Sequence, residues 1–426
     1  MKKNIIIIAT IAMILVGCSD NSLRSDIQDD QTKIGFSTIT NLQTRAENSS
    51  ASINGNLENY NTTFKVWGYK VVAGTETAVL GAVVGSSNTT YPGQLVSHVE
   101  ATTNPAVAEH WEYTPIRFWD KSATLYKFYA VSPSREDWVW DNANRKVSIS
   151  NFAISGYNSV TGTPATAVVT NKVLTQNLTT EDLMISTDIT NYKNYTNTPV
   201  NLSFNHILSR LNIGVRKATT LDNFTVYLKS IKVFNMKSNG SFNESLASGT
   251  DLSGGTIARW ATAPTTPTTF TSGVGYDALS DLLEITSTET TPASCYQYVY
   301  EGLVIPQSVA YSKSVLVNED ITDVSSYLYI NGSNAVSEGG NGDSDPYIVI
   351  EYEIGKTENS VYTKHDSYKY YYNLADVFNG DATTAVNFCE GWQNTLKITI
   401  APTAIDFDAD VFEWAEKYPS QNYDAQ

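Results

Sequence analysis

Histidine is the side chain best suited to acid–base chemistry near neutral pH, and it is rare in this chain. The four histidines are His98, His110, His206 and His365, and none lies at metal-ligand spacing from another. His206 adjoins a strand-like run, and we interpret it as a packed histidine with one hydrogen bond. No GxSxG, HExxH, P-loop or GxGxxG motif occurs in a suitable context. We therefore predict a protein that is not an enzyme and has no catalytic residues and no cofactor.

Two acidic segments have residue types that bind cations. Asp406, Asp408 and Asp410 alternate with apolar residues, so three carboxylates would share one face of a strand. This pattern fits a cation site or the charged face of an edge strand, where repeated charge discourages aggregation, and we favour the edge strand. Residues 337–346 (SEGGNGDSDP) lack the spacing and terminal glutamate of an EF-hand, and we interpret them as a hairpin tip. We predict no metal site.

Aromatic residues are abundant, with 26 Tyr, 14 Phe and 8 Trp. A row of tyrosines of this kind could stack on sugars, although tyrosines on strands more often pack with a solvated hydroxyl. The most conspicuous row consists of Tyr368, Tyr370, Tyr371 and Tyr372. The row alone does not establish a glycan site.

The N-terminus has the pattern of a lipoprotein signal. Two lysines precede an apolar run from Ile5 to Val16, which is shorter than the roughly 20 apolar residues that span a bilayer. The run ends in Leu-Val-Gly-Cys18, where small residues before a cysteine admit a lipoprotein peptidase. We predict that residues 1–17 are a signal peptide and that membrane lipid is attached through Cys18.

Charge and cysteine content limit the partners. The formal net charge is −16 at pH 7, and a strongly acidic chain repels phosphate backbones, so we expect no nucleic-acid partner. Once Cys18 is lipidated, Cys295 and Cys389 remain in an oxidising compartment. They form either a disulfide or two buried thiols, and the sequence does not decide between these states.

Short alternating segments separated by turn residues indicate an all-β protein built from Greek-key sandwiches. After a polar tether, Ile34–Leu42 has the composition of a strand, and a domain boundary is placed near residue 200. A turn is expected at Ser238–Gly240. The other predicted strands are Phe64–Tyr69, Ala123–Val131, Asp182–Ser186, two within Asn201–Val215, Phe224–Val233, Cys295–Ile305, Tyr347–Ile354, Tyr368–Tyr372, Asn394–Ile400 and Ile405–Val411.

Several segments, taken in order, carry a family resemblance. They are the Cys18 lipobox, Thr44-Arg45-Ala46, Phe64–Tyr69 (FKVWGY), Leu202–Leu211 (LSFNHILSRL), Tyr298–Gln307 (YVYEGLVIPQ), Trp392–Ile400 (WQNTLKITI), Ile405–Phe407 and Val411–Trp414. Together they resemble the fimbrillin family, the lipoprotein subunits of type V pili. The resemblance covers almost the whole chain.

The resemblance implies a processing pathway and a fold. It implies two transthyretin-like Greek-key β-sandwich domains, here residues 46–200 and 201–426, and a lipoprotein precursor at the outer membrane. An arginine-specific protease would cut between Arg45 and Ala46, removing residues 18–45 with their strand. The mature chain would then join other pilus subunits in an extracellular fimbria by β-strand exchange, using a strand donated from a neighbour's C-terminal region.

Physical reasoning supports the same picture. A sandwich that loses an edge strand exposes an apolar groove and unpaired backbone groups, and it can accept a strand from elsewhere. Ile39 has the opposite parity to the residues that would fill the groove. The groove-filling residues would be Ile34, Phe36, Thr38, Thr40 and Leu42.

Several alternatives remain open. The tail Ala415–Gln426 is polar, so either the donor lies earlier, around Ile398–Val411, or this subunit does not donate. The chain could be a stalk, tip or anchor subunit, and the sequence does not name a host or bacterial surface ligand. The main rival is a glycan-binding lipoprotein that stays tethered at the cell surface. A secreted hydrolase would need a carboxylate pair that no motif identifies.

Overall fold

The computed structural model is nearly all β. Among the described residues it contains one short α-helix, α1 (Leu374–Asn379), and two single-turn 3-10 helices at Thr219–Leu221 and Glu244–Leu246. The prediction of an all-β protein is confirmed. No helix in the described part of the chain is long and apolar enough to cross a membrane. The structure describes residues 32–40, 61–85, 88–154, 168–170, 173–175, 181–186, 189–192, 198–234, 236–237, 239–246, 257–262, 272–275, 283–289, 296–309, 328–330, 334–336, 346–379, 385–402 and 405–413.

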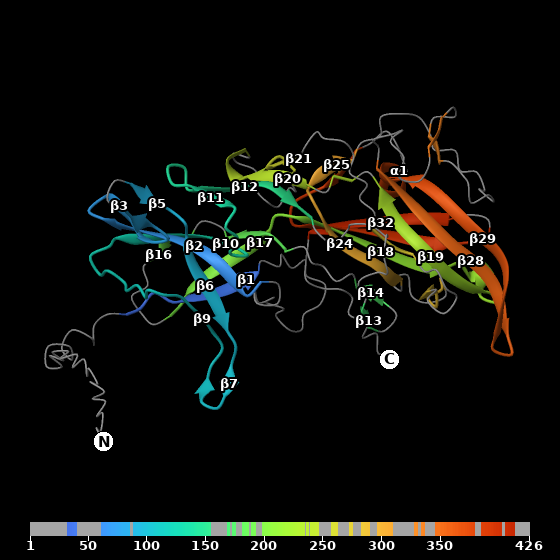
Figure 1. The fold of residues 1–426 in the computed structure, drawn as a ribbon, viewed down its shortest axis with the longest axis horizontal. Coiled ribbons are helices and arrows are strands. Elements are labelled where there is room, and N and C mark those ends of the chain that lie inside the picture. The colour runs from blue at the N-terminus through green and yellow to red at the C-terminus, as the bar shows by residue number, and fades with distance from the viewer. Residues whose placement is uncertain are drawn as a thin grey trace, which may run out of the picture.

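The N-terminal part forms a nine-stranded sheet, at the left of Figure 1. Strand β16 (Ile189–Tyr192) also pairs with β10, and β3 (Thr75–Leu80) pairs with β2. Along its main path the order is β1 (Phe36–Thr40), β17 (Val200–His206), β15 (Met184–Ser186), β10 (Leu125–Ser132), β2 (Thr63–Val72), β6 (Gln94–Val99) and β9 (His110–Glu112).

Strand β2 is buried on both faces. Phe64 and Val66 point into one apolar core, and Trp67 and Tyr69 point into a second core on the opposite face. Successive strand side chains alternate between faces, so two covered faces produce a nearly continuous run of buried residues.

A four-stranded sheet takes two strands from each half of the chain. Its order is β11 (Trp138–Asp141), β12 (Lys146–Ala153), β20 (Asn239–Asn243) and β21 (Trp260–Thr262). Asn239 and Gly240, expected in a turn, lie in β20 instead, and this expectation was wrong. A Cβ at Gly240 would lie 3.1 Å from Ile305 Cγ2 and 3.3 Å from the Ala261 carbonyl oxygen, so close packing, not a turn, accounts for the glycine.

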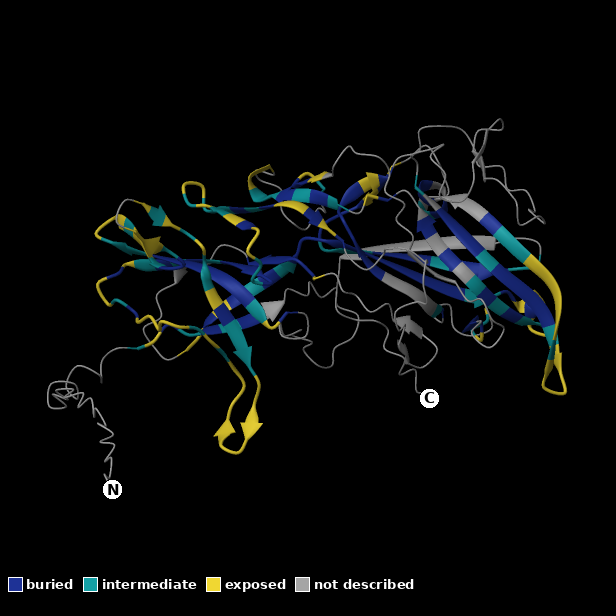
Figure 2. Ribbon diagram, in the orientation of Figure 1, coloured by how far each residue is buried: buried dark blue, intermediate teal, exposed yellow. Residues whose placement is uncertain are grey.

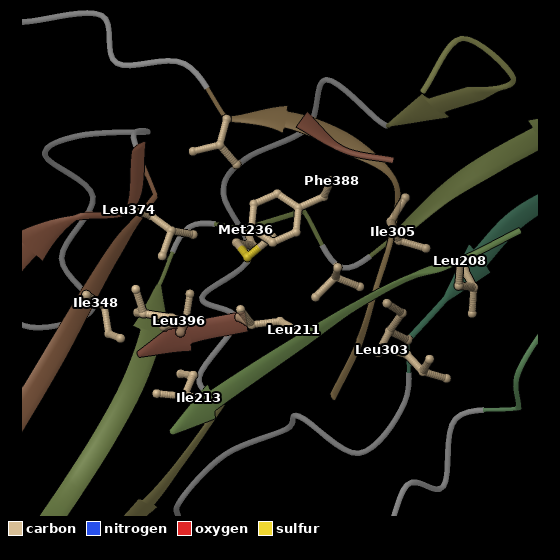
Figure 3. Packing of buried hydrophobic residues seen from close by; sticks show 14 of the residues in the cluster. Leu208, Leu211, Ile213, Met236, Leu303, Ile305, Ile348, Leu374, Phe388 and Leu396 are labelled. Atoms are coloured by element: carbon tan, nitrogen blue, oxygen red, sulfur yellow. The ribbon is translucent and has the colours of Figure 1, made fainter. Parts of the chain in front are cut away.

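The C-terminal part is a sandwich of two sheets. One is β24 (Gln297–Val304), β18 (Ser209–Lys217), β31 (Trp392–Ile400) and β32 (Ile405–Glu413). The other is β22 (Ser272–Gly275), β19 (Thr225–Phe234), β28 (Tyr347–Glu358) and β29 (Val361–Asn373), with β23 (Leu283–Glu284) also on β19. Leu211, Ile213 and Leu396 from the first sheet belong to the same buried cluster as Ile348 from the second (Figure 3).

Five two-stranded elements complete the part of the fold that the structure describes. The outermost parts of two hairpins are exposed. The β7–β8 tip and the β28–β29 turn both project from the body of the molecule (Figure 2). The five small elements are β4 (Val83–Val84) with β5 (Thr89–Thr90), β7 (Thr102–Thr103) with β8 (Ala106–Val107), β13 (Val168–Thr170) with β14 (Val173–Thr175), β25 (Gln307–Val309) with β30 (Val386–Phe388), and β26 (Leu328–Ile330) with β27 (Asn334–Val336).

The joint between the two parts is the short link from β17 to β18. Its two residues, Ile207 and Leu208, are fully buried. The Trp260 indole Nε1 donates a 2.7 Å hydrogen bond to the Ile207 carbonyl, and the Gly391 amide donates one of 2.8 Å to the Leu208 carbonyl. Contacts from β21 and from the turn before β31 therefore hold this link.

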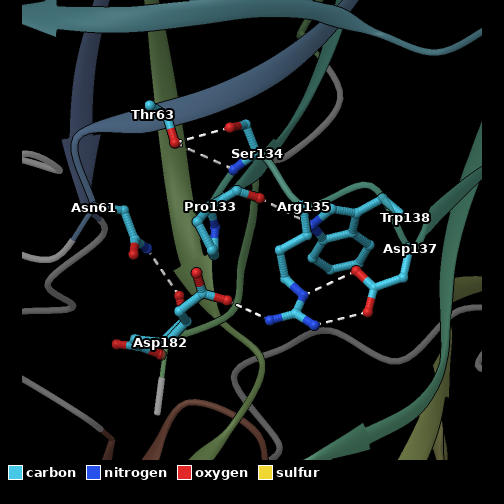
Figure 4. A network of polar contacts seen from close by, with 9 residues as sticks. Asn61, Thr63, Pro133, Ser134, Arg135, Asp137, Trp138 and Asp182 are labelled. Carbon is cyan, nitrogen blue, oxygen red and sulfur yellow. Dashed lines mark hydrogen bonds and ion pairs between the residues drawn. The ribbon is translucent and has the colours of Figure 1, made fainter. Parts of the chain in front are cut away.

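A polar network supports the N-terminal side of the joint (Figure 4). The Asn61 amide donates a 2.8 Å hydrogen bond to the carbonyl of Asp182, and Arg135 Nη2 donates one of 2.7 Å to Asp137 Oδ2. The Trp138 indole donates to the Pro133 carbonyl at 3.0 Å. These bonds fix the chain around the starts of β2, β11 and β15.

Candidate functional site

Strand β1 lies at one edge of the nine-stranded sheet and pairs in parallel with β17. In this register Phe36 lies opposite Val200 and Thr38 opposite Leu202. The Val200 amide also donates a 2.8 Å hydrogen bond to the Gly35 carbonyl. Because β15 occupies the far side of β17, loss of β1 would leave the near edge of β17 unpaired.

The residues just before β1 are bonded on their other side by the segment Tyr113–Trp119, which we call the latch. The Ile34 amide donates to the Arg117 carbonyl at 2.8 Å, and the Trp119 amide donates to the Thr32 carbonyl at 2.9 Å. The Tyr113 hydroxyl donates to the Ile34 carbonyl at 2.8 Å. The segment from residue 32 to 40 therefore lies in a seat formed by the latch and by β17.

Apolar side chains of the β1 segment fill an aromatic pocket. Ile34 and Phe36 are buried, and Thr38 is 9 % exposed. The Phe36 ring lies 5.7 Å from that of Phe128 and 6.0 Å from that of Phe64, both nearly edge-on. Burying one such side chain stabilises the fold by about 1.5–3 kcal/mol, so an empty seat would be a strong apolar binding site.

The remaining residues predicted for this site concern lipidation, cleavage and the end of the removable strand. Cys18, Leu42, Arg45 and Ala46 fall outside the described residues, as does the backbone that connects β1 to Arg45. Thr40 is the last residue of β1, and its side chain is also outside the description. Lipidation, cleavage and removal of the strand therefore remain predictions.

The latch was missed by the sequence analysis, which predicted no element between Tyr69 and Ala123. The structure has strands β3, β6 and β9 there, followed by the latch. A usable signal was the alternation of Trp111 and Tyr113 with polar residues, because both rings face the core around β1. The two-residue and three-residue strands of this region are too short for periodicity to reveal.

Buried pairs of ionisable side chains occur near the joint. His206 Nδ1 lies 2.7 Å from Asp182 Oδ2, and both side chains are buried. Arg259 pairs with Glu390, and its guanidinium carbon lies 5.1 Å from the centre of the Phe242 ring. Burial raises the pKa of Glu390 to about 7. His206 is the last residue of β17 and Glu390 lies shortly before β31, so these pairs join segments that border the joint.

Cys389 is a buried free thiol, and Cys295 lies outside the described residues. Burial and the adjacent Glu390 carboxylate raise the pKa of Cys389 to about 11. A thiol with a raised pKa is a poor nucleophile because the thiolate is the reactive form. We therefore assign Cys389 a packing role.

The remaining candidate segments supply no ligand site among the described residues. Asp406, Asp408 and Asp410 lie in β32, an edge strand, but their side chains are outside the description. No group of three or more metal-ligating side chains occurs in the part of the chain that the structure describes. Tyr370 is buried, and its ring stacks on that of Tyr368 at 6.2 Å, so these two tyrosines pack together within the fold.

Comparison with known proteins identifies the relatives of this chain. A family model described as fimbrillin-like matches residues 44–414. A fimbrial protein from Bacteroides vulgatus is 13 % identical, with 90 % of this chain and 99 % of that chain covered and a TM-score of 0.46. The tip fimbrial protein Mfa3 from Porphyromonas gingivalis, solved with a C-terminal truncation, is 9 % identical, with coverage of 90 % and 100 % and a TM-score of 0.36. No curated protein matches the chain.

Proposed function

This chain belongs to the fimbrillin-like family, and from that premise we propose that it is a pilus subunit whose β1 strand is removed and replaced during assembly. Members of the family are structural adhesion proteins of cell-surface fimbriae, not enzymes. In the proposed pathway the precursor is attached to the outer membrane through Cys18. An arginine-specific protease then cuts between Arg45 and Ala46.

The observation that carries the proposal is the position of β1. The strand sits at a sheet edge, its buried residues fill an aromatic pocket, and it precedes the proposed cut in the sequence. Removing residues 18–45 would take the whole β1 segment with them. The vacated seat would present the unpaired edge of β17 beside an open apolar pocket, which favours addition of an extended strand.

A candidate donor is strand β32. Its sequence places Ile405, Phe407 and Ala409 at alternate positions, which repeats the spacing of Ile34, Phe36 and Thr38 in the β1 segment. Among the described residues, β32 pairs only with β31 and forms the edge of its sheet. An edge strand leaves by breaking one ladder, whereas a central strand would have to break two.

Digestion of the full chain with an arginine-specific protease tests this function. We expect a cut between Arg45 and Ala46, detected by intact mass, followed by a ladder of oligomers on a native gel. The matched control is Arg45→Gln, which should remain uncut at this bond and monomeric. A chain that is cut but stays monomeric would exclude strand exchange. A chain that resists cleavage at Arg45 would instead support a tethered anchor or the glycan-binding alternative.

A further inference from the structure

The latch forms hydrogen bonds to backbone atoms of the residues that precede β1. Its three hydrogen bonds involve the Thr32 carbonyl, the Ile34 amide and the Ile34 carbonyl. Bonds of this kind do not depend on the side chains of the bound segment. Any extended strand that entered the seat in the same register would offer the same backbone carbonyl and amide groups to the latch.

Tyr113 is the side chain through which the latch acts. Its hydroxyl donates to the Ile34 carbonyl and accepts a 3.2 Å hydrogen bond from the Arg117 amide. Its ring centre lies 5.7 Å from that of Phe36. Burial raises the pKa of Tyr113, so the phenol stays protonated and keeps its donor hydrogen at neutral pH. Tyr113 thus connects the backbone contact with the apolar pocket.

The latch is anchored to the body of the sandwich by contacts that do not involve β1. Trp119 packs edge-on against Tyr126 at 4.7 Å. The next residue, Asp120, pairs with Lys70 at 2.6 Å and accepts a 2.9 Å hydrogen bond from the Ser122 amide. These contacts would remain after the β1 segment left, so the latch would keep its position beside the empty seat.

We propose that the latch is a second backbone-binding edge of the seat and takes residues 403–405 of a second copy of this chain as it takes residues 32–34 of its own. This proposal rests on the strand exchange proposed above. The sequence Thr403-Ala404-Ile405 is uncharged and ends in the same side chain as Thr32-Lys33-Ile34. An isoleucine therefore enters the pocket at the point where Tyr113 binds the backbone.

The latch also sets the order of release. Cleavage after Arg45 frees the C-terminal end of the β1 segment, while its N-terminal end is the part that the latch holds. The single ladder with β17 opens first, from Thr40 backwards, and the latch bonds open last. The latch thereby slows loss of the segment until a replacement strand competes for the seat.

The test measures release of the cut segment from full-length protein in detergent micelles. Wild type, Tyr113→Phe and the control Tyr91→Phe are cut with the arginine-specific protease. An excess of a synthetic peptide of residues 402–413 is then added, and the departing segment is followed by mass spectrometry. Tyr113→Phe should release its segment about five- to tenfold faster, because one partly buried hydrogen bond to the backbone is lost. Tyr91→Phe removes a phenol outside the seat and should match the wild type.

A second readout shows that the effect is on binding. The labelled 402–413 peptide should bind the emptied Tyr113→Phe protein about five- to tenfold more weakly than the emptied wild type, while both proteins keep the same thermal midpoint. Equal release and equal affinity in Tyr113→Phe and wild type would overturn the latch proposal and leave strand exchange intact. A wild type that neither releases its segment nor binds the peptide would overturn strand exchange itself.

Discussion

The β1 seat and the joint between β17 and β18 are both buried, yet different contacts hold them. The seat is lined by apolar and aromatic side chains, and its hydrogen bonds join neutral groups. The joint is bordered by two buried pairs of ionisable side chains, His206–Asp182 and Arg259–Glu390. Emptying the seat exposes apolar surface that another apolar strand can cover. Opening the joint would separate charges whose partners are fixed in the protein. The contacts of the seat therefore suit replacement of one strand by another, whereas those of the joint suit a fixed connection between the two parts.

The largest expected effect on stability comes from removing the aromatic ring of Phe36, which fills the seat. Phe36→Ala should lower the free energy of unfolding of the uncut chain by about 3–5 kcal/mol, because it leaves a cavity between Phe64 and Phe128. Urea denaturation followed by tryptophan fluorescence measures this. The control Ser37→Ala, at the neighbouring position of opposite parity, should cost less than about 0.5 kcal/mol. A loss below about 1 kcal/mol for Phe36→Ala would mean that side chains do not hold β1.

Removing one charge of the Arg259–Glu390 pair should lower the free energy of unfolding more than removing both. At pH 8, where the Glu390 carboxyl is ionised in the wild type, Arg259→Met leaves it buried without its partner and should cost about 3 kcal/mol in urea denaturation. The double variant Arg259→Met/Glu390→Met should recover most of that loss, because no charge is left behind. If the double variant is as unstable as the single one, packing and not charge holds the joint.

Stability at the joint should also depend on pH. Burial raises the pKa of Glu390 in the folded state from 4.5 to about 7, so between these values the folded chain binds more protons than the unfolded chain. The stabilising contribution is complete below about pH 4.5 and is lost as the pH rises through 7. Relative to Glu390→Gln, the wild type should lose about 2 kcal/mol between pH 5 and pH 8 in parallel denaturation curves. A constant difference over this range would contradict the prediction.

The smallest effect is expected at the anchor of the latch. Lys70→Met removes the partner of Asp120, a pair that is about one-third exposed on both sides, and should cost less than about 1 kcal/mol. Lys70 and hydrogen bonds from Ser122 lower the pKa of Asp120 to about 2. The contribution of the ion pair to stability is therefore complete above about pH 4 and is lost as the pH falls through 2. Thermal unfolding at pH 7 with and without 1 M salt measures the contribution. A large, salt-independent loss would show that Lys70 acts by packing.

Part of the seat could be predicted from local pattern. The β1 strand was expected at Ile34–Leu42 and is observed at Phe36–Thr40, and burial of Ile34, Phe36 and Thr38 follows the expected parity. Alternation along a strand identifies side chains that share a face, so it reports burial before any neighbour is known. The same pattern in Ile405–Val411 indicated a strand, and the observed β32 spans Ile405–Glu413.

The latch and the buried pairs could not be predicted in this way. Arg259 and Glu390 are 131 positions apart, and nothing in the residues around either one indicates its partner. Arg117 and Trp119 of the latch bond a backbone segment that lies far away in the sequence, so no local pattern indicates this partner. Gly240 was interpreted as a turn residue because glycine permits turns, although its actual reason is close packing against Ile305.

The amino-acid sequence alone was enough to predict the all-β class and the strand parity of the β1 segment, because both depend on residue type and short-range spacing. The resemblance to the family depended instead on the order of several motifs along almost the whole chain. Tertiary structure alone decided that β1 pairs in parallel with β17, that a latch bonds the residues before it, and that Arg259 pairs with Glu390 beside the joint. A period of two in the sequence predicts which face of a strand is buried. Hydrogen bonding between strands is non-local, so the strand that pairs with each edge is determined only when the whole chain has folded.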